Sequence, residues 1–133
     1  MARKRILVVE DNEDNRRILL YRLRKIADFD IVETANGEEA IAAVEAAPPD
    51  LIFMDLKMPV MDGWEATRRI RALEAGREVP IIALTAQAMA GDEQKALANG
   101  CDDYLAKPVV DPELVREKIV RHLTLDDGSP ADG

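Results

Sequence analysis

Five short apolar segments alternate with segments of helical periodicity, and this alternation limits the possible folds more than any other feature. The first, third and fourth apolar segments are apolar on both faces, which is typical of parallel strands covered by helices on both sides. The alternation therefore predicts one doubly wound α/β domain with a five-stranded parallel sheet, a (βα)5 arrangement. The expected strands are residues 5–9, 29–34, 51–54, 81–84 and 103–106.

The helices between these strands are predicted from capping residues as well as from periodicity. Asn36, with Glu39 three residues later, and Asp111, followed by proline, are typical helix starts. Asp62 is expected to cap the third helix and Gly76 to end it. The expected helices span about residues 14–27, 36–46, 64–75, 92–98 and 112–123. Residues 1–123 form the predicted domain, and the aperiodic residues 124–133 are expected to be a flexible tail or linker stub.

Size, charge and composition exclude several classes of protein. A length of 133 residues fits one domain, and no apolar run approaches the ~20 residues that cross a bilayer. The apolar segment after the basic N-terminus ends at Glu10, too soon for a signal peptide, so we expect a cytoplasmic protein without membrane contact. A net charge of −8 argues against nucleic-acid binding. The only histidine, His122, lacks metal-ligand spacing and is predicted to be a surface or flanking residue.

Side chains capable of chemistry follow the apolar segments, where the carboxyl ends of parallel strands meet. Sites in open α/β sheets form outside this edge. One aspartate at a strand end is most often a turn former or helix cap, but here five such side chains are expected together. They are Glu10 and Asp11 after the first strand, Asp55 after the third, Thr85 after the fourth and Lys107 after the fifth.

This set of residues predicts a magnesium-dependent phosphoryl-transfer site. Three carboxylates at one site repel one another and raise their pKa values unless a cation is present. Magnesium prefers oxygen ligands and keeps several waters, so Glu10 or Asp11 would act partly through water while Asp55 binds directly. The ion and Lys107 would neutralise the phosphoryl oxygens, and Thr85 would donate to another of them. Asp55 would then attack in line as a carboxylate nucleophile.

Four segments of the chain resemble the signature blocks of receiver domains of response regulators. They are residues 6–12, 51–63, 81–86 and 103–108, and the resemblance extends over residues 5 to 123. The chemotaxis receiver CheY is a flavodoxin-like fold of strand order 2-1-3-4-5, and the resemblance implies that order here. Residues 85–93, with Gly100 and Cys101, are most similar to stand-alone regulators of the DivK kind and to receivers attached to hybrid histidine kinases.

The resemblance also implies a role for each site residue. The phosphorylation site would consist of Asp55 as phosphoacceptor, Lys107 as phosphate-binding lysine and Thr85 as switch hydroxyl. The surrounding roles would fall to Glu10 and Asp11 as the magnesium-binding pair, Lys57 as a backbone-carbonyl ligand of the metal and Tyr104 as switch aromatic. Many receivers carry two aspartates where this chain has Glu10-Asp11, although Glu-Asp is also common in the family.

A protein of this family is a phosphoacceptor switch rather than an enzyme with a separate substrate, with intrinsic magnesium-dependent autophosphorylation and autodephosphorylation. The implied donor is a histidine kinase or a histidine phosphotransfer protein. The implied target is a protein that binds the fourth helix, the fifth strand and the last helix. Lys57 and Gln87 each lie two residues beyond a site residue, so they are expected to flank its entrance and to tune the lifetime of the phosphoryl group.

Three alternatives fit parts of the pattern. A phosphatase of the haloacid dehalogenase type needs a second aspartate two positions beyond the nucleophile, where this chain has Lys57. A flavodoxin-like carrier needs a first loop that can bind phosphate, whereas residues 10–14 are mostly acidic. A receiver used only for docking typically loses the acceptor or the lysine, and this chain keeps both Asp55 and Lys107.

Overall fold

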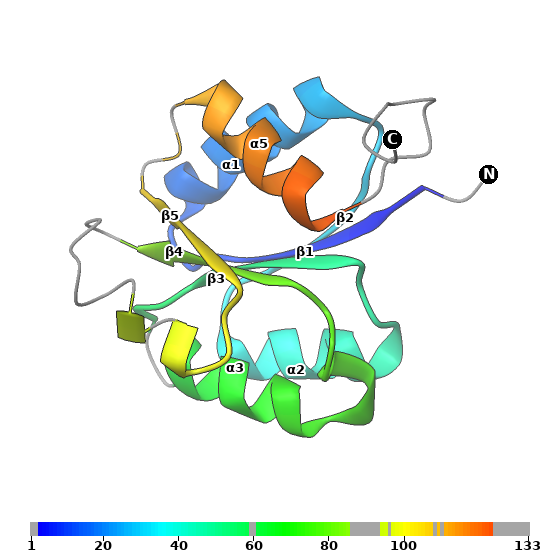
Figure 1. Ribbon diagram of the computed structural model, residues 1–133, viewed down its shortest axis with the longest axis vertical. Helices are drawn as coiled ribbons and strands as arrows, with labels where there is room; N and C mark the ends of the chain where they lie inside the picture. The colour runs from blue at the N-terminus through cyan, green and yellow to red at the C-terminus, as the bar shows by residue number, and fades with distance from the viewer. Residues whose placement is uncertain are drawn as a thin grey trace.

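The computed structural model describes residues 3–58, 61–85, 94–95, 97–107, 109 and 111–123, and it contains one five-stranded parallel sheet. The strands lie in the order β2-β1-β3-β4-β5 (Figure 1). This order and the parallel pairing confirm the predicted flavodoxin-like arrangement. The strands are β1 (Arg5–Val9), β2 (Asp30–Thr34), β3 (Leu51–Asp55), β4 (Ile81–Thr85) and β5 (Asp103–Ala106).

Helices cover both faces of the sheet, and each layer encloses its own apolar core. Helices α1 (Glu13–Ile26) and α5 (Pro112–His122) lie on one face, and α2 (Gly37–Ala46) and α3 (Gly63–Ala72) lie on the other (Figure 1). Successive residues of β1 alternate between the two cores, because neighbouring side chains of a strand point to opposite faces. No helix in the described ranges is long and apolar enough to cross a membrane.

Capping side chains define where the helices begin. The side chains of Asn36, Asp62 and Asp111 accept hydrogen bonds from backbone N–H groups in the first turns of α2, α3 and α5, as predicted. Helix α1 begins at Glu13, one residue earlier than predicted, because Asn12 is its cap. Each cap therefore fixes the angle at which a helix leaves the loop after a strand.

The third helix is shorter than predicted. Instead of running to about residue 75, α3 ends at Ala72, and a short 3-10 turn, Glu74–Gly76, follows it. The guanidinium of Arg71 donates to the backbone carbonyls of Gly76 at 3.0 Å and Val79 at 2.6 Å. These bonds hold the chain turned back against α3, so the helix cannot continue.

The predicted fourth helix lies partly outside the described residues. Gln94, Lys95, Leu97 and Ala98 are helical within residues 92–98. Gly100 has a φ of 104°, in the left-handed region that glycine adopts without strain, and its N–H donates to the carbonyl of Leu97 at 3.2 Å. The predicted helix end at Asn99-Gly100 is therefore confirmed.

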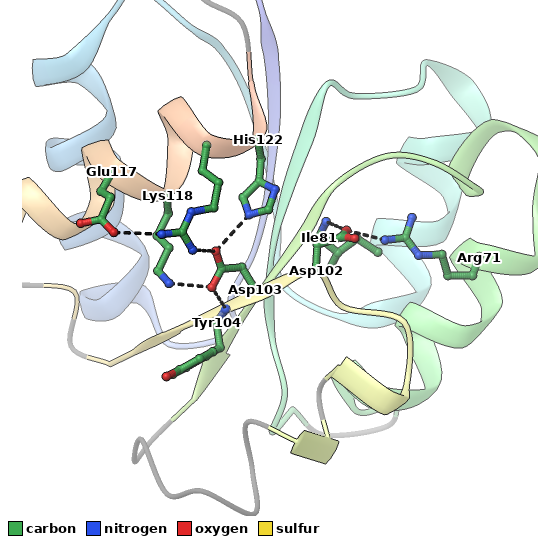
Figure 2. A network of polar contacts seen from close by, with 9 residues as sticks. Arg71, Ile81, Asp102, Asp103, Tyr104, Glu117, Lys118 and His122 are labelled. Carbon is green, nitrogen blue, oxygen red and sulfur yellow. Dashed lines mark hydrogen bonds and ion pairs between the residues drawn. The ribbon is translucent and has the colours of Figure 1, made fainter. Parts of the chain in front are cut away.

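A buried carboxylate joins the last helix to the edge strand. The side chain of Asp103, at the start of β5, is 7% exposed and accepts hydrogen bonds from Lys118 at 2.6 Å and Arg121 at 3.2 Å. His122 Nε2 lies 3.0 Å from the same carboxylate, and the Tyr104 N–H donates to it at 2.9 Å (Figure 2). His122 was expected to be a surface or flanking residue, but its side chain is only 17% exposed and packs against β5.

We predict that Asp103→Asn destabilises the fold. Burial alone would raise the pKa of Asp103, but hydrogen bonds from Lys118, His122 and the Tyr104 N–H outweigh it and hold the pKa below its usual value. A carboxylate with a lowered folded pKa stabilises the protein above its unfolded pKa of about 3.9, and this contribution is lost as pH falls through the folded value. The substitution should cost about 2–3 kcal/mol at neutral pH, because hydrogen bonds to a charged group are lost.

Urea unfolding of both proteins at pH 7 and pH 3 measures this contribution. The difference between wild type and Asp103→Asn should be large at pH 7 and smaller at pH 3. Asp28→Asn is a matched control, since the side chain of Asp28 is 85% exposed and pairs with the exposed Arg3 at 3.5 Å. A difference that does not change with pH would mean that the charge of Asp103 is not what stabilises the fold.

Candidate phosphorylation and metal site

The predicted site residues meet at the carboxyl edge of the sheet. Asp55 is the last residue of β3, and Thr85 is the last residue of β4, which pairs in register with β3. Glu10 follows β1 directly, with its N–H bonded to the carbonyl of Thr34, and Lys107 follows β5, with its N–H bonded to the carbonyl of Thr85. Backbone pairing therefore fixes where each functional side chain starts.

Among the described residues, one oxygen of the Asp55 carboxylate accepts two hydrogen bonds and the other accepts none. Asp55 is 1% exposed, and its Oδ1 accepts hydrogen bonds from the Lys107 ammonium at 3.0 Å and from the Lys57 N–H at 3.2 Å. Its Oδ2 is buried and accepts no hydrogen bond from the described residues. Asp55 Oδ2 therefore lies in a carboxylate bound to the Lys107 ammonium, yet it is available to bind a metal ion or to form a bond to phosphorus.

Three carboxylates lie close enough to bind a single cation. One oxygen each from Glu10, Asp11 and Asp55 lie within 4.8 Å of one another. Glu10 Oε1 lies 3.4 Å from the Lys107 ammonium, but within the described structure this buried oxygen accepts no hydrogen bond. Buried oxygens without donors and acidic groups in this number are the environment that a hard divalent ion prefers. The residues present therefore fit a magnesium site.

The charges at this site are poorly balanced without a cation. Burial and, after it, the neighbouring Asp55 raise the pKa of Glu10 to about 7, although the Asn12 N–H and the Lys107 charge lower it. Burial and the same neighbour also raise the pKa of Asp11. Burial alone would lower the pKa of Lys107, but the hydrogen bond and charge of Asp55 raise it overall, so the ammonium stays charged. A bound divalent ion would favour the charged forms of Glu10 and Asp11.

The start of α3 packs directly against the end of β3. The Gly63 N–H donates to the carbonyl of Leu56 at 3.1 Å. A side chain at Gly63 would place its Cβ 2.1 Å from the carbonyl oxygen of Asp55, closer than any contact allows. Glycine is therefore required at this position, and the close contact fixes the backbone of Asp55.

Thr85, Tyr104 and Lys57, three further residues predicted from the sequence, differ in burial and in their contacts. Thr85 is buried, and its hydroxyl donates to the carbonyl of Leu105 at 3.5 Å, a long contact. Tyr104 is half-buried on β5, with the Lys118 ammonium 5.1 Å from the centre of its ring. The side chain of Lys57 is exposed beside Asp55. Gln87 lies outside the described residues.

Two residues that contact the site were not singled out from the sequence. The Asn12 N–H donates to Glu10 Oε2 at 3.1 Å, and Arg16 donates to the Glu10 carbonyl at 2.7 Å. Asn12 has a detectable sequence signal, because asparagine before a helical segment is a typical cap. Arg16 has no such signal, since one arginine among several on α1 gives no indication of which carbonyl it contacts.

Comparison with known proteins assigns this fold and site to a family. The family model described as response regulator receiver domain matches residues 6–119. The polar-differentiation response regulator DivK of Brucella anthropi is 37% identical over 112 residues, which cover 84% of this chain and 90% of that protein. This chain therefore belongs to the receiver domain family of two-component and phosphorelay signalling.

Two solved structures share both fold and sequence with the chain. The receiver domain of the sensor histidine kinase PA1611 from Pseudomonas aeruginosa, which has a magnesium ion in its active-site cleft, is 42% identical with a TM-score of 0.82, covering 91% of this chain and 98% of that one. The receiver of the Saccharomyces cerevisiae regulator Ssk1, in complex with the histidine phosphotransfer protein Ypd1, is 36% identical with a TM-score of 0.83, covering 96% and 95%.

Proposed function

We propose that this chain is a cytoplasmic phosphoacceptor switch that takes a phosphoryl group onto Asp55 from a histidine kinase or a histidine phosphotransfer protein. The observation that carries the proposal is the Asp55 carboxylate, in which Oδ1 is held by Lys107 while the buried Oδ2 has no donor among the residues that the structure describes. The complex of a related receiver with a histidine phosphotransfer protein supports the class of donor.

In this proposal Asp55 Oδ2 acts as the nucleophile. As the bond from Oδ2 to phosphorus forms, the bond from phosphorus to the donor histidine nitrogen breaks, and its electron pair stays on the imidazole. Bound magnesium, held by Glu10, Asp11, Asp55 and the Lys57 carbonyl, would neutralise the phosphoryl oxygens. The Lys107 ammonium, which bonds to Asp55 Oδ1 at 3.0 Å, is available to bind a phosphoryl oxygen.

A transfer assay tests this function. The chain is mixed with histidine phosphotransfer proteins that carry radioactive phosphohistidine, and separately with radioactive acetyl phosphate, in the presence of magnesium. Label should appear on the chain and should be released by hydroxylamine, as expected of an acyl phosphate. No label from either kind of donor would contradict the proposal, and label resistant to hydroxylamine would point to a different acceptor.

We propose that Thr85 couples phosphorylation to conformation, and we predict that Thr85→Ala accepts phosphate but responds weakly. A change from 1:99 to 99:1 between two states requires about 5.5 kcal/mol. Hydrogen bonds to charged groups contribute about 1.5–3 kcal/mol each, so bonds from Thr85 and Lys107 together are just sufficient. Moving the Thr85 hydroxyl to a phosphoryl oxygen would break its long contact with the Leu105 carbonyl on β5.

The fluorescence of Trp64, the single tryptophan, can follow this response. Trp64 lies in α3 next to Gly63, which contacts Asp55. On phosphorylation, Thr85→Ala should show less than half of the wild-type change, and Thr85→Ser, which keeps the hydroxyl, should retain most of it. A full change in Thr85→Ala would show that coupling does not pass through this hydroxyl.

We predict that Lys57→Ala shortens the lifetime of the phosphoryl group at least severalfold. The long exposed side chain follows Asp55 by two residues and can shield the phosphoryl oxygens from attacking water. A tenfold change in rate needs only about 1.4 kcal/mol of barrier. The assay follows decay of labelled protein after donor removal, with magnesium constant and Lys25→Ala, on α1, as control. Decay identical to wild type would remove Lys57 from this role.

Gln87→Ala should also change the rate of dephosphorylation, and no direction is assigned to that change.

We propose that the output surface comprises the fourth helix, β5 and α5, and that it binds a protein rather than nucleic acid. Asp103 supports this, because its contacts with Lys118 and His122 link the edge strand to the last helix (Figure 2). A change at Thr85 would pass through Leu105 into the same strand. The net charge of −8 disfavours a nucleic-acid partner.

A further inference from the structure

Arg16 holds the loop that carries two of the three carboxylates. Its Nη1 donates to the backbone carbonyl of Glu10 at 2.7 Å, and its Nε lies 3.2 Å from Glu33 Oε1 on β2. The Arg16 side chain is 21% exposed; its bond to the Glu10 carbonyl is partly buried, whereas its contact with Glu33 is exposed. One guanidinium therefore links α1, β2 and the loop after β1.

These contacts complete a set of bonds around Glu10. Its N–H donates to the carbonyl of Thr34 at 3.1 Å, and its side-chain Oε2 accepts from the Asn12 N–H at 3.1 Å. Arg16 binds the Glu10 carbonyl, so both backbone polar groups and one side-chain oxygen of Glu10 are bonded. The orientation of this peptide group determines where the next residue, Asp11, starts, so Arg16 influences the positions of two carboxylates.

We propose that Arg16 is a positioning residue of the metal site, fixing Glu10 and Asp11 in the arrangement that a divalent cation needs without itself being a ligand. This inference rests on the metal site of the proposed function. Partners that orient metal ligands typically contribute about 10–100-fold to metal affinity.

Electrostatics alone predicts the opposite effect of removing Arg16 on metal affinity, and this difference makes the inference testable. A positive charge near a cation site repels the cation, so removing the charge should tighten binding. Arg17 is the matched control, because it neighbours Arg16 on α1 but is 71% exposed and pairs with Glu13 at 2.6 Å. Arg16→Gln and Arg17→Gln remove the same charge, and only the first removes the bond to the Glu10 carbonyl.

The experiment titrates the full chain with Mn²⁺ and follows the free ion by electron paramagnetic resonance, with Mg²⁺ competition to show that both ions bind the same site. Arg16→Gln should bind Mn²⁺ about tenfold more weakly than wild type, and Arg17→Gln equally or slightly more tightly. Arg16→Lys keeps the charge but reaches only one of the two acceptors, so its affinity should be intermediate. Circular dichroism at the assay temperature shows whether each variant is folded. If Arg16→Gln is unfolded, the Mn²⁺ affinity of Arg16→Lys tests the positioning role instead.

Three outcomes would overturn the inference, and they are distinguishable. If wild type binds Mn²⁺ and a folded Arg16→Gln binds as tightly as Arg17→Gln, Arg16 does not position the ligands. If Arg16→Gln is unfolded and Arg16→Lys binds like wild type, the inference also fails. If wild type binds no Mn²⁺, the metal site of the proposed function is wrong, and the role of Arg16 fails with it.

Discussion

Asp55→Asn is expected to accept no phosphate from acetyl phosphate under conditions in which wild type is labelled. The amide cannot supply the carboxylate oxygen that attacks phosphorus. Incorporated radioactivity per chain, with magnesium present, measures the effect.

Asp62→Asn is the matched control for this substitution. Asp62 is an exposed carboxylate that caps α3, and asparagine is an equally good N-cap. This variant should be labelled like wild type. Full labelling of Asp55→Asn would show that another residue is the acceptor, and loss of labelling in Asp62→Asn would indicate an effect on the fold rather than on the chemistry.

Removal of divalent cations is the second change with a large expected effect. Chelation should abolish labelling and magnesium should restore it, because Glu10, Asp11 and Asp55 otherwise repel an incoming phosphoryl group.

Loss of one carboxylate charge about 4 Å from a divalent ion costs roughly 2 kcal/mol even in water, or about thirtyfold in affinity. Asp11→Asn should therefore need much more magnesium for half-maximal labelling.

Asp14→Asn is the control for the metal requirement. Asp14 is exposed in the first turn of α1 and is not among the clustered carboxylates. Its magnesium requirement should stay close to that of wild type. Labelling that persists unchanged in excess chelator would rule out the metal-dependent mechanism, and equal requirements in Asp11→Asn and Asp14→Asn would remove Asp11 from the metal site.

The fold and the site could be predicted from the sequence where local signals agree with the tertiary structure. β1, β3 and β4 are buried on both faces, so their apolar runs were unambiguous. Once these strands were known to be parallel, their carboxyl ends had to lie at one edge, and this placed Asp55 near Glu10 and Lys107. Caps such as Asn36 and Asp111 were readable because a cap and its helix are adjacent in sequence.

The features that were not predicted depend on contacts between distant residues. Helix α3 ends early because Arg71 binds carbonyls that come later in the chain, such as that of Val79. His122 packs against β5, with its side chain only 17% exposed, because Asp103, 19 residues earlier, accepts its hydrogen bond. Arg16 contacts the Glu10 carbonyl because of how α1 packs beside β1 and β2. No local pattern specifies which acceptor a long cationic side chain reaches.

Chemical mapping of the phosphorylated residue tests the central claim most directly. Wild-type protein is phosphorylated, reduced with borohydride, which converts an aspartyl phosphate to homoserine, and digested for mass spectrometry. The account predicts homoserine at position 55 and unchanged residues at Glu10, Asp11 and His122. An unmodified Asp55 in stoichiometrically phosphorylated protein, or modification at any of those other positions instead, would contradict the account.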